Sequence, residues 1–488
     1  MARWSQLVPL DIHLLVFEML AQDPTANENK EQRGRPWTKK HPLSSYALVC
    51  RDWQNFFEKK IYRHLALSQS SLRDFDNFVR RQRGLVEYIW LKIKLARYTC
   101  TECVEFGLPK YQANHSTAEE AISRLFRILS TWDRDQVAVS GRLTLEISAH
   151  SHSDLHHAFF SDLYFDTSPF ATGEPLLTDP GHAWVTSPRS RPLELASISR
   201  LFGVPLRPEF EQRLPPVAVI NALVIRRQTR QRFAPNALLE VLSSLPNLSS
   251  MTYESWRDFL HFPRGTYLLQ HRLAIIAGGI KRLDDIRGFQ RGLQFYTLYR
   301  YDYKGVAMYS RASLAKRSLS LGRLSASYIV DAADFFKASH PTWVWNRLTS
   351  LSLTSRLLVC TTGAAEVNQL LMEAGTAAVQ MPKLTKMDIW NGTKGNACIF
   401  RYEANGDYVT VRWRGTWNLD IDPEVIDVWK KVAQLCARKD LAVLRSETSD
   451  KTAIKSHAAA IQELGIGEHV IHRVSLKQIQ KETERYWF

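Results

Sequence analysis

The sequence predicts an α/β protein in which a short N-terminal helical module precedes an irregular strand–helix solenoid, closed by a β-hairpin and a helix. Three observations lead to this fold class. Apolar residues recur at helical spacing within the first 57 positions, and from residue 84 onward strand-like segments alternate with amphipathic helical ones. An Asn405-Gly406 pair then separates two alternating segments, which indicates a tight hairpin over 398–413, and a helix is predicted after Asp422.

Two amphipathic helices are predicted in the N-terminal module, within residues 8–20 and 43–57. Pro9 suits a first helical turn, where no intrahelical partner for the backbone N–H is needed. The apolar sides of the two helices are expected to pack on each other as a small bundle. Apolar residues run nearly all the way round this bundle, which predicts a docking face. The connecting residues 21–42 are polar, contain Pro and Gly, and are predicted to form a loop.

These two segments also carry recognisable motifs. In one-letter code the first reads VPLDIHLLVFEML and the second contains LVCRDW. The pair resembles the F-box, a helical module of ubiquitin-ligase substrate receptors. The resemblance implies that residues 1–64 form this module and dock on a Skp-type adaptor, which joins a cullin. The residues implied in adaptor binding are Pro9, Ile12, Val16, Phe17, Leu20, Leu43, Leu48, Val49, Cys50 and Trp53.

The sequence departs from the F-box pattern at two places. Val8 stands where the family usually has leucine, and the loop over 21–42 is longer than the usual link between the two halves. The alternative interpretation is that these helices merely cap the hydrophobic end of the following domain.

The solenoid is predicted over residues 216–440. An L-x-x-L-x-L spacing, clearest at Leu348, Leu351 and Leu353, places the first residue in a turn and the next two on the inner side of a short strand. Stacked units of this kind bury one another's apolar faces, so the pattern predicts a leucine-rich-repeat-like solenoid. The same spacing, imperfect in two units, starts at residues 220, 248, 283, 316, 348 and 384.

Flanking segments complete the prediction. Residues 65–215 are expected to hold the first strand–helix units and then a long excursion rich in Pro, Ser, His and Gly over 150–215, and residues 441–488 are expected to be tail helices. The predicted strands and helices of these units lie at 85–95, 142–148, 116–132, 234–246 and 365–375, with Ser116 as an N-cap. With the CTEC segment and the Trp-rich end, the chain resembles filamentous-fungal F-box proteins whose C-terminal region is uncharacterised.

The 488-residue chain is basic, with 64 Lys and Arg against 49 Asp and Glu, and its basic clusters lie at 33–40, 80–83 and 226–232. These are interpreted as solvated surface; nucleic-acid contact, nuclear import or phosphate binding at 226–232 are the alternatives. Six cysteines form no disulfide framework. No signal peptide and no apolar run of about 18 residues is present. An intracellular protein, cytoplasmic or nuclear and without a membrane partner, is therefore expected.

Possible metal sites are weak. Cys100 and Cys103 form one C-x-x-C pair, but zinc needs four ligands and no second pair follows at finger spacing. His115 is the nearest further candidate, and His152 with His156 forms an i, i+4 pair without the glutamate of a metalloprotease motif. No metal and no cofactor are expected.

Catalytic motifs are also missing from the sequence. No phosphate-binding glycine loop and no G-x-S-x-G motif occurs. Cys50 lies within the F-box pattern and is interpreted as a small apolar filler. Tryptophans gather in the last third, where they form either an aromatic recognition surface or a core with large side chains. Trp390 is the candidate for a target-binding surface.

The predicted function is therefore non-enzymatic. The first hypothesis is a substrate receptor of a Skp–cullin–F-box-type ubiquitin ligase, with an adaptor, a cullin and an unidentified target protein as partners. The second hypothesis is a scaffold for protein interaction or nucleic-acid association that uses the basic surface, although nucleic acid is the less expected partner. A third, an unrecognised hydrolase, requires titratable residues clustered in a pocket.

Overall fold

The structure is a computed structural model of the chain. It describes residues 10–22, 42–99, 108–133, 143–151, 153, 205–226, 229, 231–254, 285–289, 314–316, 318–328, 330–405, 408–447, 451–472, 475–476 and 479. The predicted excursion over 150–215 falls mostly outside these residues, as do Pro9, most of the predicted loop over 21–42 and the CTEC segment.

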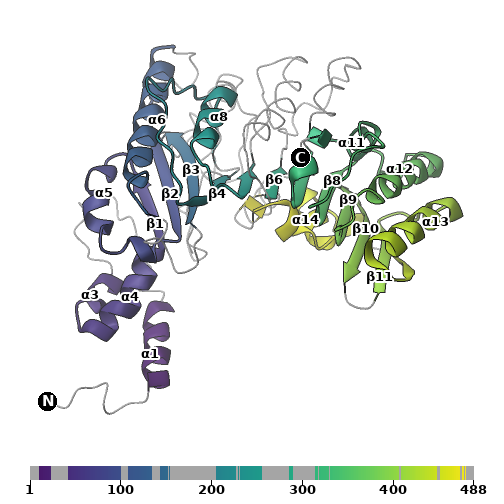
Figure 1. Cartoon of the computed structure of the whole chain (residues 1–488), viewed down its shortest axis with the longest axis horizontal. Helices are drawn as coiled ribbons and strands as arrows, with labels where there is room; N and C mark the ends of the chain where they lie inside the picture. Colours follow the sequence, from purple (N-terminus) through teal and green to yellow (C-terminus); the bar gives the residue numbers. More distant parts are fainter. Residues whose placement is uncertain are drawn as a thin grey trace.

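One twelve-stranded sheet runs through the described residues, with its strands side by side in sequence order (Figure 1). Neighbouring strands are parallel except for the antiparallel pairs β9–β10 and β10–β11. The protein is therefore mixed α/β, as predicted. The strands are β1 (His64–Ser68), β2 (Tyr88–Leu95), β3 (Leu143–Ser151), β4 (Ile220–Ile225), β5 (Ser250–Tyr253), β6 (Asp285–Phe289), β7 (Arg323–Ser327), β8 (Ser350–Thr354), β9 (Lys386–Thr393), β10 (Asn396–Asn405), β11 (Tyr408–Gly415) and β12 (Leu441–Glu447).

Helices lie on both faces of the sheet. The helices that follow individual strands pack on one face and share a single large core with it; they are α5 (Leu72–Val79), α6 (Leu108–Leu129), α8 (Pro235–Ser243), α11 (Ala332–Lys337), α12 (Ala364–Ala378) and α13 (Pro423–Val432). On the other face, α14 (His457–Glu463) packs against β9 and β10, and α15 (Gly467–Val470) against β6 and β7. We call the face that carries α5, α6, α8, α11, α12 and α13 the helix-covered face, and the opposite face the open face. Among the described helices, none combines the length and apolar character needed to cross a membrane.

The predicted apolar spacing forms the core of the helix-covered face. Leu348, Leu351 and Leu353 are fully buried, and Leu351 lies between Leu324 of β7 and Met387 of β9. Burial of each such side chain contributes about 1.5–3 kcal/mol. Because each strand offers only two or three of these side chains, the sheet acquires its stability from stacking successive units.

One unit was placed in the wrong register. The prediction starts the fourth unit at residue 316, but Ser318–Ser320 form a short 3₁₀ turn and β7 begins at Arg323. The pairing of Leu324 with Leu351 shows that the unit starts at Leu321. The third apolar position of this unit is occupied by Ala326, a small residue, so the unit does not match the L-x-x-L-x-L spacing in the sequence.

Three other predictions need correction. The second N-terminal helix is interrupted at residues 47–50, giving α3 (Pro42–Tyr46) and α4 (Arg51–Arg63). Ser116 lies inside α6, where its hydroxyl donates to the carbonyl of Gln112 (3.3 Å), and is not an N-cap. Residues 441–447 form strand β12, which extends the sheet beyond the predicted hairpin, because Leu441 and Val443 pack on the main core.

Candidate functional site

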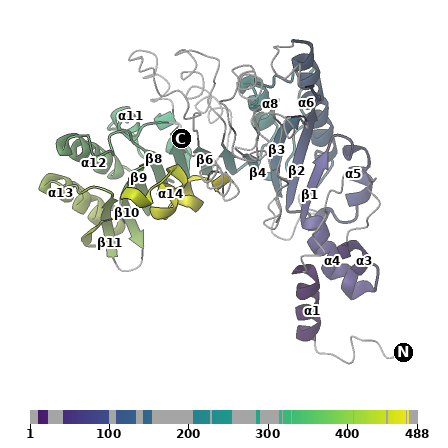
Figure 2. The same ribbon diagram turned by 180° about the vertical axis from the view of Figure 1, so that it is seen from behind.

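Helices α1 (Leu10–Gln22), α3 and α4 form a helical module that projects from the β1 end of the sheet (Figure 2). Helix α4 leads directly into β1, since it ends at Arg63 and the strand begins at His64. Phe17 of α1 packs on three rings of α4, with ring centroids 4.9–5.7 Å apart. The exposed ion pair between Lys60 and Glu18 (2.8 Å) adds at most about 1 kcal/mol, so aromatic packing holds α1 in place.

The structure separates the predicted adaptor-binding residues into two sets. Phe17 and Leu43 are buried inside the module together with Phe57, and Leu20 and Trp53 pack partly buried against them. These side chains hold the module together. Exposed residues form the second set, Ile12, Leu48, Val49 and Cys50, while Val16 is half-buried.

The exposed set extends further than the prediction. Leu14, Leu15 and Met19 on α1 are also exposed, and we call Ile12, Leu14, Leu15, Met19, Leu48 and Val49 the outer apolar surface. Their exposed fractions range from 42% to 78%. Helical spacing could have found the α1 residues, but the sequence could not say which side of α1 faces α4.

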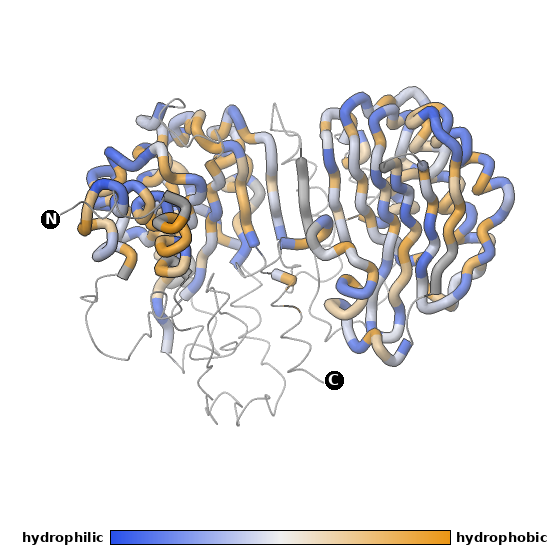
Figure 3. Tube along the Cα trace, turned by 90° about the horizontal axis from the view of Figure 1, so that it is seen from below, coloured by the Kyte–Doolittle hydropathy of each residue, from blue (hydrophilic) through white to orange (hydrophobic). Residues whose placement is uncertain are grey.

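The outer apolar surface is unusual within this molecule. It supplies six of the eleven large hydrophobic side chains that are exposed among the described residues. Figure 3 shows hydrophobic stretches, in orange, on the helices nearest the N-terminus. The aromatic cluster beneath them is separate from the main core of the sheet. The module therefore does not use its apolar residues simply to cap the sheet, which weighs against the alternative interpretation.

Trp390 is not a surface residue, contrary to the prediction. Its side chain is fully buried, because the open face at β9 is covered by α14. The ring stacks on His457 of α14 at 5.9 Å and meets Tyr328 edge-on at 5.5 Å. The Nδ1–H of His457 donates to the carbonyl of Gly392 (2.6 Å). Trp390 therefore belongs to a second core and cannot contact a target directly.

The covering segment, residues 451–479 where described, is anchored along the open face. Arg414 of β11 forms an ion pair with Glu463 of α14 (2.7 Å). At the other end, the buried carboxylate of Glu254, which follows β5, accepts hydrogen bonds from the His472 backbone N–H and the Ser475 hydroxyl. The chain's own C-terminal residues therefore occupy the open face between β5 and β11.

A buried polar cluster lies on the open face at β2–β4. Glu146 pairs with Arg226 (2.5 Å) and accepts a hydrogen bond from the Tyr88 hydroxyl. The Arg226 guanidinium lies over the Trp90 ring at 4.9 Å, and the Lys92 ammonium lies over the same ring at 3.8 Å. Burial raises the pKa of Glu146, and the nearby Arg226 charge opposes that rise. Burial and the Glu146 charge also raise the pKa of Tyr88.

This cluster changes the interpretation of the basic run at 226–232. Arg226 and Arg232 are buried, so neither is a solvated residue or an exposed phosphate ligand. The basic run at 33–40 lies outside the described residues. The run at 80–83 lines a pocket, described below.

The predicted metal candidates are not brought together in the part of the chain that the structure describes. No group of three or more His, Cys, Asp or Glu side chains there is arranged to hold a metal ion. Cys100, Cys103, His152 and His156 lie outside the described residues. His115 accepts a hydrogen bond from the Arg207 backbone N–H (3.2 Å), and burial together with the Arg207 charge lowers its pKa.

Comparison with known proteins locates one similarity. Residues 296–472 match a family model described as a family of unknown function, DUF6546. The matched range contains β7–β12 together with α14 and α15, so it includes the last six strands of the sheet and most of the segment that covers their open face. No curated protein matches the chain.

Proposed function

We propose that the chain is a substrate-receptor subunit of a Skp–cullin–F-box-type ubiquitin ligase and has no catalytic activity of its own. The helical module would bind the adaptor and the rest of the chain a target protein. Ubiquitin transfer would then be accelerated by tethering, which raises the effective concentration of the target. The observation that carries the proposal is the outer apolar surface, which extends over α1 and the turn after α3.

The energetics of this surface favour a protein partner. Complete burial of a Leu, Ile or Met side chain contributes about 1.5–3 kcal/mol, so covering these half-exposed residues would give about 1 kcal/mol each. The aromatic cluster around Phe17 and Phe57 already fixes α1 against α4. A preformed surface loses less conformational entropy on association, which improves affinity.

The sheet is proposed to be a leucine-rich-repeat-like solenoid. Support comes from the sequence-ordered parallel strands β1–β9 and from the helices that follow several of them on one face. Since the covering segment occupies the open face from β5 to β11, target binding is assigned to β1–β4 or to the ends of the sheet.

A pull-down with purified Skp-type adaptor tests the proposal. The variants Leu15→Asp/Met19→Asp and Val49→Asp place charges on the outer apolar surface without touching the inner aromatic cluster. Leu435→Asp is the matched control. Leu435 is 65% exposed, similar to the three substituted residues, but it lies after α13 and outside the helical module. Adaptor recovery should fall at least tenfold for the first two and stay at the wild-type level for the control. Equal recovery with all four proteins would contradict adaptor docking.

A nucleic-acid-associated scaffold is the second candidate, favoured by the formal net charge of +15. Electrostatic binding to a nucleic acid weakens steeply with salt, by orders of magnitude between about 50 and 200 mM for several phosphate contacts. Binding through the outer apolar surface should be almost insensitive to salt over that range. Measuring adaptor and nucleic-acid retention at both salt concentrations distinguishes the two functions.

A further inference from the structure

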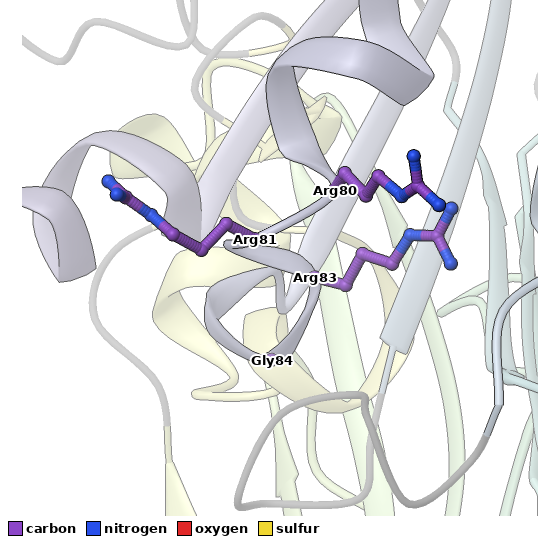
Figure 4. A pocket seen from close by; sticks show the side chains of 4 residues that line it. All are labelled: Arg80, Arg81, Arg83 and Gly84. Atoms are coloured by element: carbon purple, nitrogen blue, oxygen red, sulfur yellow. The ribbon is translucent and has the colours of Figure 1, made fainter.

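A pocket of about 560 Å³ lies where the chain passes from α5 to β2, and Arg80, Arg81, Arg83 and Gly84 line it (Figure 4). This connection is short. Val79 at the end of α5 and Val86 just before β2 are both buried and fix the segment at its two ends. Three arginines within four positions therefore border one concave surface.

Arg83 is fixed before any ligand arrives. Its guanidinium pairs with Asp76 (2.6 Å) and lies over the Trp132 ring at 5.4 Å, which leaves the side chain 13% exposed. The Nε atom is buried and makes no hydrogen bond among the described residues. Arg83 therefore has a guanidinium that is oriented by Asp76 and Trp132.

Arg80 provides a second positive charge beside it. Figure 4 shows that the side chains of Arg80 and Arg83 extend to the same side of the segment, whereas Arg81 points the other way. Arg81 pairs with Glu58 of α4 (2.9 Å). In the described part of the chain, Arg80 has no carboxylate within ion-pair distance. Asp76 therefore offsets the charge of Arg83, and the positive charge of Arg80 remains.

This arrangement suits a compact anion. Paired guanidinium groups bind the oxygens of phosphate through several charge-assisted hydrogen bonds at once. The volume is within the range of small-ligand pockets, so an organic group attached to the phosphate also fits. An extended polyanion is disfavoured, because Asp74 and Asp76 of α5 and Glu58 of α4 lie near the arginines in sequence or in contact with them.

We infer that the pocket binds a phosphate monoester, with Arg80 and Arg83 contacting the phosphate oxygens. The inference is independent of the proposed ligase function, because it concerns neither the outer apolar surface nor the covering segment. The phosphate could come from free phosphate, a phosphorylated side chain or a small phosphorylated metabolite, which share the same chemistry.

Calorimetric titration of the full chain tests the inference. The probes are inorganic phosphate, O-phosphoserine and a phosphoserine peptide with its unphosphorylated counterpart. Arg80→Gln is the decisive variant, because Arg80 is exposed and its loss should leave the fold intact. Arg73→Gln is the matched control, an exposed arginine of α5 outside the pocket. Removal of a charge-assisted hydrogen-bond donor weakens binding by about ten- to a hundredfold.

The expected result is saturable binding of phosphate-containing probes to wild type and Arg73→Gln, and at least tenfold weaker binding to Arg80→Gln. Comparison of the probes identifies the source: tighter binding of the phosphoserine peptide than of O-phosphoserine indicates a protein ligand, and equal affinity indicates a small molecule. No saturable binding to wild type, or equal weakening by both substitutions, would overturn the inference. Thermal melting of each variant by circular dichroism verifies that the fold is retained.

Discussion

The contact between Gly392 of β9 and Ala460 of α14 sets how closely the covering segment approaches the sheet. A Cβ atom at position 392 would lie 2.7 Å from the Ala460 Cβ and 3.4 Å from the Trp390 ring. Carbon atoms do not approach to 2.7 Å, so Gly392→Ala must displace α14. Overpacking of this kind costs about 1–3 kcal/mol. Gly392 does not have a positive φ, so the loss should come from the contact and not from backbone strain.

A second substitution can restore the space. Ala460→Gly removes the opposing methyl group, at a cost of about 1 kcal/mol from the lower helix propensity of glycine. Gly392→Ala/Ala460→Gly should therefore be more stable than the sum of the two single effects predicts, by about 1 kcal/mol or more. Ala459→Gly is the matched control, since it carries the same helix cost but leaves the clash in place.

Urea unfolding followed by circular dichroism measures the free energies, and hydrogen exchange of residues 457–464 reports local opening of α14. Gly392→Ala should accelerate exchange there, and Ala460→Gly should reverse part of that effect. Strict additivity of the two substitutions, or rescue by Ala459→Gly as effective as by Ala460→Gly, would refute the close packing of α14 on β9.

Four further predictions concern a buried thiol, a buried ion pair and a helix cap. Burial raises the pKa of Cys398 to about 12, so iodoacetamide at pH 8 should label the exposed Cys360 while Cys398 stays unmodified in the folded protein, as peptide mapping can verify. Arg226→Met should destabilise the chain by about 3–5 kcal/mol in urea unfolding, because it leaves the Glu146 carboxylate buried without its partner; a value below 1 kcal/mol would contradict the pairing. The pKa of Glu146 is higher in the folded than in the unfolded state, so its contribution to the free energy of unfolding is most favourable below the unfolded pKa and is lost as pH rises through the folded pKa. Glu146→Gln should therefore reduce the decrease in the free energy of unfolding between about pH 4 and 8, as unfolding titrations can measure. Asp331→Ala should cost about 0.5–2 kcal/mol, since Asp331 caps α11 through the Ala333 N–H (3.0 Å); an unchanged midpoint would contradict the cap.

Much of the sheet could be predicted because its pattern is local. In β8 and β9 the apolar triplets that begin at Leu348 and Leu384 are buried as expected. The position of β7 was predicted wrongly because Leu319 and Leu321 have the spacing of the last two apolar positions of a unit. The observed unit consists of Leu321, Leu324 and Ala326.

The open face could not be predicted in the same way. Trp390 directly follows the inward-facing residues Met387 and Ile389, and for that reason the sequence indicated it as a surface candidate. It is buried only because residues about 70 positions later fold back over it, as the ring contact with His457 shows. Within the N-terminal module, apolar residues surround α1 almost completely, so the sequence predicted a docking surface but could not separate Phe17, which faces inward, from Leu15, which faces outward.

The hydrogen bond between Glu254 and Ser475 joins residues 221 positions apart. During synthesis at about 5–20 residues per second, Ser475 is made roughly 10–40 s after Glu254. Until the covering segment has been synthesised, the strands from β5 to β11 that are already complete lack the residues that cover their open face, and side chains such as Glu254 and Trp390 are without their partners. A binder raised against this uncovered surface would distinguish a growing or truncated chain from a finished one.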